Sequence, residues 1–188
     1  MCAAGVSLAA VGGYVTAPIE VRRARLSDAE SIAAFVNAAF LKATQSQVPD
    51  RQPVTGAGVV ARFGQVGFII AEQECEMVGL LGWQIENLVV RVTDYLVALS
   101  GTEARMVARS LVEKMESEAK ELLVESALLF LPARPSATLL SFWQRLGYEA
   151  ERLEDLDPAC REAVSEWGLD AEHILTKRLR EDLVGRPI

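Results

Sequence analysis

The segment LVVRVTDYLVALSGTEARMVARSLVEKMESEAKEL, residues Leu88–Leu122, changes its hydrophobic period at its centre and decides the architecture. Its first part, Leu88–Leu99, predicts a strand, and its second part, Glu103–Leu122, predicts a long amphipathic helix. The helix has one apolar stripe, formed by Val107, Leu111, Met115 and Leu122. The apolar run Ala127–Leu131 then predicts a central strand. This succession predicts an α/β (α+β) domain.

On the N-terminal side the sequence predicts a strand, two helices and a hairpin. The strand is Ile19–Ala24, and Ser27 and Glu30 have the spacing of a capping box at the start of the following helix. A loop, Ala43–Gln52, and a short weak helix around Val59 come next. The predicted hairpin pairs Phe68–Ala71 with Met77–Trp83 around the turn Gln73–Glu76.

On the C-terminal side Pro135–Ser136 begins a helix that Gly147 closes in a left-handed cap, before a strand from Tyr148. Asp157–Pro158 opens another helix that continues through Trp167. His173–Leu179 fits either a final strand or a helical tail. We therefore expect one domain over residues 19–180, an N-terminal extension at 1–18 and a C-terminal tail at 181–188.

The composition is that of one well-cored domain, with 188 residues, 51% hydrophobic and 24% charged. A net charge of −7 disfavours broad attraction to nucleic acid or to an anionic membrane. Three cysteines without CxxC spacing and a single histidine disfavour a disulfide framework and a zinc site. We expect a reducing, cytoplasmic environment, no metal and no transmembrane span. Residues 1–18 lack Lys and Arg, which favours a loose extension over a secretion signal.

The most specific local pattern is SATLLSFWQRLGYE, Ser136–Glu149. It resembles the N-x-x-A-x-x-L-Y-x-x-x-G-F-x segment of the GNAT superfamily of acyl-CoA-dependent N-acyltransferases, and the order of elements over Ile19–Leu179 is similar to that family. The resemblance implies a mixed, mostly antiparallel twisted sheet flanked by helices, splayed between the strands Leu88–Leu99 and Ala127–Leu131. It also implies acetyl-CoA or another acyl-CoA as co-substrate and a small-molecule or peptide amine as acceptor.

In this family the diphosphate of coenzyme A lies on backbone amides of a Q/R-x-x-G-x-G/A turn. Aligning Leu111–Val112 with the family's paired leucines puts that turn on Glu103–Ala108, where Glu103 and Met106 depart from the pattern. Two alternatives stay open for the arginines of this region, which either hold phosphates by their side chains or form solvated surface. The cofactor-binding residues implied by the resemblance are Leu99, Arg105, Met106, Val107, Ala108 and Arg109.

The family's tyrosine, a general acid toward the departing thiolate, falls on Trp143, and an indole N–H has no acid function near neutral pH. The alternatives for this role are the three tyrosines of the chain, Tyr14, Tyr95 and Tyr148. For the general base, Asp94 is the first candidate, because clean alternation places it on one apolar face, where desolvation raises the pKa of a carboxyl. The face consists of Val90, Val92, Asp94, Leu96 and Ala98.

The alternative for Asp94 is that a bulge or a strand edge returns its side chain to water. Glu86, near the end of the preceding strand, is the second candidate. Two functions are therefore consistent with the sequence. One is an N-acyltransferase, and the other is a catalytically degenerate GNAT-like protein that serves as a binding or dimerisation module. Two alternatives stay open for apolar strand residues such as Leu80–Trp83. They either pair between two chains in a homodimer or are covered by the chain's own helices.

Overall fold

The computed structural model describes residues 17–43, 52–132, 134–166 and 173–180. The predicted extension 1–18 and tail 181–188 lie outside these ranges, apart from residues 17 and 18. Most of the predicted loop Ala43–Gln52 and the end of the predicted helix at Trp167 also lie outside them. Those expectations stay predictions.

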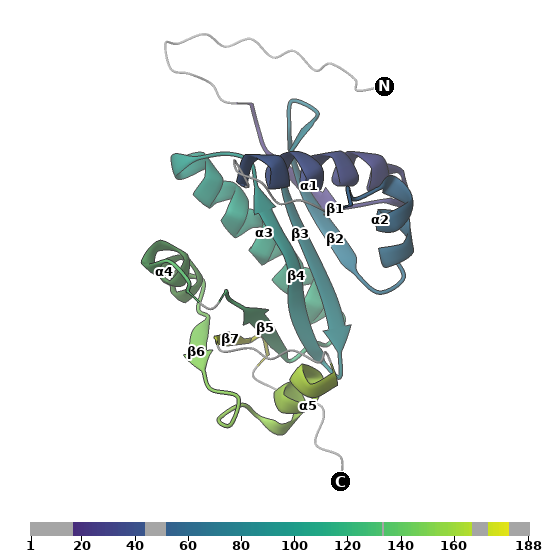
Figure 1. Cartoon of the computed structure of the whole chain (residues 1–188). Helices are drawn as coiled ribbons and strands as arrows, with labels where there is room; N and C mark the ends of the chain where they lie inside the picture. The colour runs from purple at the N-terminus through teal and green to yellow at the C-terminus, as the bar shows by residue number, and fades with distance from the viewer. Residues whose placement is uncertain (1–16, 44–51, 133, 167–172, 181–188) are drawn as a thin grey trace.

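One seven-stranded sheet organises the described chain, with the order β1-β2-β3-β4-β5-β7-β6 (Figure 1). The strands are β1 (Glu20–Arg23), β2 (Gly67–Gln73), β3 (Glu76–Glu86), β4 (Val89–Val97), β5 (Ser126–Phe130), β6 (Glu149–Glu151) and β7 (Ile174–Arg178). The helices are a short 3₁₀ turn η1 (Leu26–Asp28), then α1 (Ala29–Ala43), α2 (Gly56–Arg62), α3 (Gly101–Glu121), α4 (Ala137–Arg145) and α5 (Pro158–Glu166). The predicted element order is confirmed, and the segment from His173 forms a strand, β7.

The sheet is mixed and mostly antiparallel, as predicted. Only β4 and β5 run parallel, and their pairing covers just three positions, Val89–Arg91 opposite Ser126–Leu128. Beyond Arg91 no described strand pairs with this edge of β4, so the sheet splays there. The predicted splay between these two strands is thereby confirmed.

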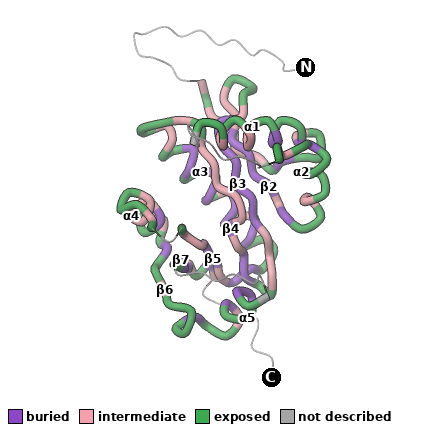
Figure 2. The backbone as a smooth tube through the Cα atoms, viewed as in Figure 1, coloured by how far each residue is buried: buried purple, intermediate pink, exposed green. Residues whose placement is uncertain are grey.

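Helices cover both faces of the sheet. α1 and α2 pack with residues such as Phe68, Ile70 and Leu80 on one face, and α3 and Trp143 of α4 pack on the other. Figure 2 shows the buried residues running along the central strands, with exposed residues on the outer turns of the helices. A Cβ on Gly79 would lie 2.8 Å from Val107 Cγ1, so the absent side chain lets α3 approach β3 closely.

Two local predictions are wrong. Ser27 lies inside the turn η1, and it is Asp28 that accepts a hydrogen bond from the Arg25 amide at 2.7 Å at the start of this turn. Leu122 lies just beyond α3 and is 54% exposed, and the stripe closes instead on Ala119, which is fully buried. The predicted left-handed cap of α4 is confirmed, because Gly147 has a φ of 84°.

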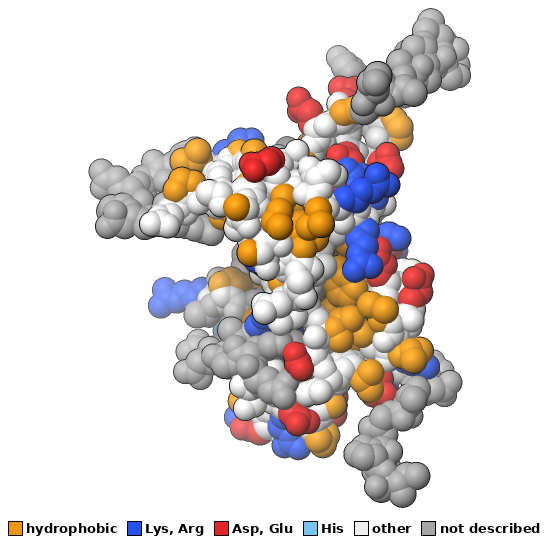
Figure 3. All heavy atoms as spheres, turned by 90° about the vertical axis from the view of Figure 1, so that its right-hand side faces the viewer, with side chains coloured by type: hydrophobic (Ala, Val, Ile, Leu, Met, Phe, Trp, Pro, Cys, Tyr) orange, Lys and Arg blue, Asp and Glu red, His pale blue; other side chains and the backbone are white. Residues whose placement is uncertain are grey.

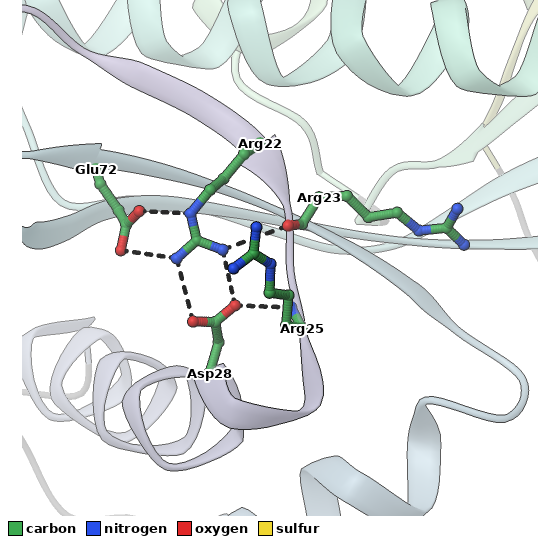
Figure 4. A network of polar contacts seen from close by, with 5 residues as sticks. All are labelled: Arg22, Arg23, Arg25, Asp28 and Glu72. Carbon is green, nitrogen blue, oxygen red and sulfur yellow. Dashed lines mark hydrogen bonds and ion pairs between the residues drawn. The ribbon is translucent and has the colours of Figure 1, made fainter.

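A polar network fixes the start of α1 to the sheet (Figure 4). The Arg22 guanidinium of β1 donates to Asp28 at 2.8 Å and to Glu72 of β2 at 2.8 Å. Both carboxylates are mostly buried, with 16% and 25% of their side-chain surface exposed. The network therefore joins β1, β2 and the entrance to α1 through one cation.

Hydrophobic side chains also remain at the surface, and Figure 3 shows those on its visible face in separate groups between charged residues. Leu41 of α1 is 74% exposed and Val60 of α2 is 46% exposed. Leu80, Leu81 and Trp83, in contrast, are at most 3% exposed and lie inside the sheet between β2 and β4. They are unavailable for the strand pairing between chains that the sequence left open.

Candidate functional site

A β-bulge in β4 shapes the site. Gly82 of β3 pairs with Asp94, whereas the next residue, Trp83, pairs with Val92, so Thr93 is the extra residue. The bulge reverses the alternation of β4. Val90 and Val92 pack with the α3 face, as do Tyr95 and Val97 beyond the bulge, while Leu96 packs on the α1–α2 face. Of the two alternatives that the sequence left open, the structure shows the bulge, and clean alternation from Val90 to Ala98 does not occur.

Asp94 forms an ion pair with Arg62, the last residue of α2. The Arg62 Nη2 to Asp94 Oδ2 distance is 2.5 Å, and the Thr93 hydroxyl donates to the same oxygen at 2.8 Å. Gly82 makes room for this arrangement, because a Cβ there would lie 2.5 Å from Asp94 Oδ2. Asp94 is thus held on the α2 face with 23% of its side chain exposed, in a polar rather than an apolar setting.

Glu86 lies at the opposite end of the β3–β4 hairpin, opposite Val89. A strand rises about 3.3 Å per residue, which puts Glu86 roughly 26 Å from Val97, where β4 ends. Asp94 is only three residues from that end. The structure therefore separates the two predicted carboxylates and leaves Asp94 beside the splay.

Four aromatic rings pack against one another on the other face of β4. The Tyr95 ring lies 5.2 Å from Trp143 and 6.2 Å from Phe142, measured between ring centroids, and Trp143 lies 5.0 Å from Tyr148. Trp143 is only 1% exposed. These rings connect α4 to β4 on the side where β5 has turned away.

Of the two phenols in this cluster, Tyr148 is buried, whereas Tyr95 is half-buried with its hydroxyl oxygen buried. Burial raises the pKa of Tyr95 above its ordinary value, and the Tyr95 hydroxyl has no hydrogen-bond partner within the described ranges. Burial, reinforced by the negative charge of Glu116, raises the pKa of Tyr148 as well. Both side chains therefore stay protonated, and so able to donate, throughout the neutral range.

The start of α3 follows directly on β4. Gly101 has a φ of 64°, a left-handed conformation that suits glycine, and the Ala104 amide donates to the Ser100 carbonyl at 3.3 Å. The amides of Gly101, Thr102 and Glu103 precede the first helical hydrogen bond, so α3 leaves them without a partner of its own. They form a small group of donors next to the splay.

The helix begins two residues earlier than predicted, and this changes the setting of the implied cofactor residues. Met106, Val107 and Ala108 lie in the second turn of α3, where backbone amides bond to carbonyls four residues earlier. Val107 is fully buried and Ala108 is 8% exposed, so both side chains belong to the core. Met106 is 50% exposed, and Leu99 is half-buried against the α3 core.

The two arginines of this helix lie on its exposed surface. Arg109 donates to Glu113 one turn later at 2.6 Å, and Arg105 lies 3.4 Å from the Thr102 hydroxyl. The pair with Glu113 raises the pKa of Arg109. Arg105 therefore lies closer to the free amides than Arg109, whose charge is already matched.

A cavity of about 690 Å³ lies elsewhere, where β4 and β5 begin and α5 covers them. Its walls include Glu151, Asp155, Asp157, Thr176 and Cys160. Burial raises the pKa of the Cys160 thiol to about 12, which leaves it unreactive as a nucleophile at neutral pH. This cavity is at the end of β4 remote from the start of α3, and none of the splay residues named above lines it.

Within the described ranges, no group of three or more His, Cys, Asp or Glu side chains is placed to hold a metal ion. No helix in the same ranges is both long and apolar enough to cross a membrane. The site residues that the sequence did not indicate are Arg62 and Thr93. Arg62 lies 32 residues from Asp94 in a weak helical segment, and no local pattern announces their pairing.

No protein-family model matches this sequence, and no curated protein matches it. The fold, however, is similar to solved structures of acetyltransferases. An acetyltransferase of the GNAT family from Staphylococcus aureus superposes with a TM-score of 0.67, at 14% identity, over 87% of this chain and 100% of the other. A GNAT superfamily phosphinothricin acetyltransferase from Sinorhizobium meliloti, in complex with acetyl-CoA, gives 0.62 at 15% identity over 90% and 93%.

The ribosomal-protein-S18-alanine N-acetyltransferase from Escherichia coli gives a TM-score of 0.60 at 11% identity, over 91% of this chain and 100% of the other. Each comparison covers nearly the whole of both chains. At these identities the likeness concerns the path of the backbone and leaves the chemistry to be argued from the site.

Proposed function

Because the chain has the GNAT fold, we propose that it is an acyl-CoA-dependent N-acyltransferase, which moves an acyl group from a thioester to an amine. The observation that carries this proposal is the continuity of two features. The edge of β4 that β5 leaves unpaired beyond Arg91 leads directly to the amides of Gly101–Glu103, which precede the first hydrogen bond of α3. An extended, amide-containing molecule that ends in a diphosphate fits such a surface.

In the proposed complex the diphosphate accepts hydrogen bonds from the amides of Gly101, Thr102 and Glu103, where the dipole of a 21-residue helix favours an anion. Arg105 is the side chain best placed to add a phosphate contact. The pantetheine arm, which contains two amides, adds to the β4 edge as a strand would. We propose that a backbone amide between Leu96 and Leu99 polarises the thioester carbonyl, with Ala98 excluded because its amide donates to the Val78 carbonyl.

Asp94 is the proposed general base for the attacking amine. Its carboxylate lies at the bulge on the α2 face, three residues before β4 ends. In this proposal an incoming ammonium group competes with Arg62 for the carboxylate and loses a proton to it before attack. The acceptor is accordingly a primary amine, small or part of a peptide, and the net charge of −7 favours acceptors with positive charge.

The test is ligand binding followed by turnover. Thermal unfolding with acetyl-CoA at about a hundred times its Kd is expected to add about 2.7 kcal/mol of stability. Release of free thiol with a panel of amines then measures transfer. Asp94→Asn is expected to lower kcat/KM by about a hundredfold, while Glu86→Gln, at the remote end of the hairpin, retains activity. Equal activity of Asp94→Asn and wild type would remove Asp94 from the proposed mechanism.

A second candidate function is a GNAT-fold protein that binds or dimerises without catalysis. Three observations favour it: α3 is helical through Met106–Ala108, Glu103 brings negative charge to the anion-binding end of the helix, and Trp143 replaces the implied tyrosine. Absence of any thermal shift at millimolar acetyl-CoA, together with a dimer in sedimentation equilibrium, would favour this function over the transferase.

A further inference from the structure

We propose that the Tyr95 hydroxyl is the proton donor to the departing thiolate, a role that Trp143 is unable to fill. This inference rests on the proposed acyl transfer and identifies a catalytic side chain on β4 rather than on α4. The argument uses the position of Tyr95, the state of its hydroxyl and the division of β4 into two faces.

Tyr95 lies in the splay. The last pair between β4 and β5 joins Arg91 and Leu128, and Tyr95 is four residues further along β4, beside the unpaired edge. The bulge at Thr93 turns its side chain toward α4, where its ring packs at 5.2 Å from Trp143. A thioester that follows the β4 edge therefore passes next to the Tyr95 ring.

The hydroxyl of Tyr95, like that of Tyr148, is a buried donor with no hydrogen-bond partner among the described residues, and it is the position beside the open edge of β4 that distinguishes Tyr95. An unsatisfied buried polar group costs about 1–3 kcal/mol, so its retention calls for an explanation. A sulfur atom that gains negative charge as the thioester breaks supplies the missing acceptor. Burial raises the pKa of Tyr95, which keeps the proton on the phenol until that charge develops.

Tyr148 is a poorer candidate for the same role. It is 1% exposed, and its ring is enclosed between Trp143, at 5.0 Å, and the Lys177 ammonium, at 5.5 Å. The carboxylate of Glu116, which binds Lys177 at 2.6 Å, lies beside it. Tyr148 thus belongs to the packing between α3 and β7, whereas Tyr95 borders the open edge of β4.

The two proposed proton transfers take place on opposite faces of β4. Asp94 and Tyr95 are consecutive residues, yet the first contacts Arg62 of α2 and the second contacts Trp143 of α4. The ammonium first loses one proton to Asp94, which passes it to water. The free amine nitrogen then forms its bond to the thioester carbon and gives a second proton to Asp94. As the carbon–sulfur bond breaks, the sulfur keeps the electron pair and takes the Tyr95 proton. The second proton on Asp94 is then released to water, and the Tyr95 phenolate regains a proton from water. One amide and one free thiol result, and one proton from the starting ammonium is released.

The test compares two donors with leaving groups of different basicity. Acetyl-CoA expels an alkyl thiolate that needs a proton, whereas S-(4-nitrophenyl) thioacetate expels a far less basic thiolate that leaves without one. Tyr95→Phe is expected to lower kcat/KM about a hundredfold with acetyl-CoA and less than about threefold with the activated donor. Tyr148→Phe, a matched loss of a buried phenol hydroxyl, is expected to keep more than half of wild-type activity with both donors.

The controls separate this inference from the function on which it rests. Urea unfolding and the acetyl-CoA thermal shift show whether Tyr95→Phe folds and binds like wild type. If the wild-type protein turns over acetyl-CoA and Tyr95→Phe is equally active, the role of Tyr95 is overturned and the proposed transferase function stands. An equal loss with both donors would also overturn it, because it would indicate misplaced substrate. A wild-type protein without acyl transfer overturns both proposals together.

Discussion

Two arginine–carboxylate sites on the α1–α2 side of the sheet use the same chemistry in different ways. Arg22 binds two carboxylates, Asp28 and Glu72, and ties together β1, β2 and the start of α1 (Figure 4). Among the carboxylates of the described residues Arg62 binds Asp94 alone, at a bulge; its guanidinium also lies 5.2 Å from the centroid of the Phe68 ring, and its side chain is 41% exposed. The first cation is enclosed by its partners, whereas the second is free on one side.

The difference suits the Arg22 network to stabilising the fold and the Arg62–Asp94 pair to taking part in a reaction. An enclosed cation with two mostly buried carboxylates contributes to stability, because removing it leaves negative charge without compensation. A more exposed pair contributes little, so its partners are able to separate at low cost when a ligand arrives. The predictions below test this contrast, beginning with the largest expected effect.

Arg22→Met is expected to lower the free energy of unfolding by about 2–3 kcal/mol, since two carboxylates lose charged hydrogen bonds. Arg62→Met is expected to cost less than about 1 kcal/mol. Urea unfolding of both variants measures the contrast. Arg109→Met is the surface control, because Arg109 is 67% exposed and pairs only with Glu113 within its own helix. Equal losses for Arg22→Met and Arg62→Met would remove the distinction between the two sites.

Gly82→Ala tests the packing of the sheet beneath the Arg62–Asp94 pair. A Cβ at Gly82 would lie 2.5 Å from Asp94 Oδ2 and 2.6 Å from the Thr93 hydroxyl, so the bulge must shift. Overpacking of this kind is expected to cost about 1–2 kcal/mol in urea unfolding. Gly64→Ala is the matched control, because nothing lies within 4 Å of the added carbon. A loss no larger at Gly82 than at Gly64 would show that the bulge accepts a side chain.

Local signals in the sequence predicted most of the fold. The hairpin turn at Glu74–Cys75, the cap at Gly147 and the change of period between β4 and α3 each depend on a few adjacent residues. The splay and the sheet topology followed from the resemblance in element order. Strand registers and helix caps were harder to predict from the sequence where neighbouring residues compete for the same role. At the entrance to α1, Ser27 was the predicted cap, but Asp28 accepts the hydrogen bond instead.

The site depended on contacts that the sequence does not encode locally. The bulge at Thr93 arises where Gly82 leaves room on the adjacent strand, and the Arg62–Asp94 pair joins residues 32 positions apart. Periodicity alone therefore left two alternatives open for Asp94, the apolar face and a bulge, and did not choose between them. The same bulge turned Tyr95 toward Trp143, a contact that needs the packing of α4 against β4 to be known.

The stabilisation that Arg22 provides is expected to depend on pH. The Arg22 guanidinium holds the pKa of Asp28 below its usual range. A lowered folded-state pKa gives stability that is complete above the unfolded value of about 3.9 and is lost as the pH falls through the folded value. The stability difference between wild type and Arg22→Met is therefore expected to shrink as the pH falls from about 5 to 3. A difference that stays constant over this range in urea unfolding would contradict the charge-based account.

The smallest expected effect concerns the start of α3. Glu103 places a negative charge in the first turn, where it stabilises the helix and opposes a bound diphosphate at the same amides. Glu103→Gln is therefore expected to tighten coenzyme A binding by about two- to fivefold, which is under 1 kcal/mol. Glu113→Gln, three turns further along α3, is the control with the same loss of charge and is expected to leave affinity within about 1.5-fold. Calorimetric titration at low and high salt separates the cases, because the gain from Glu103→Gln must diminish as salt screens the charge. A gain that persists at 1 M salt would instead mean that the glutamate side chain blocks the amides sterically.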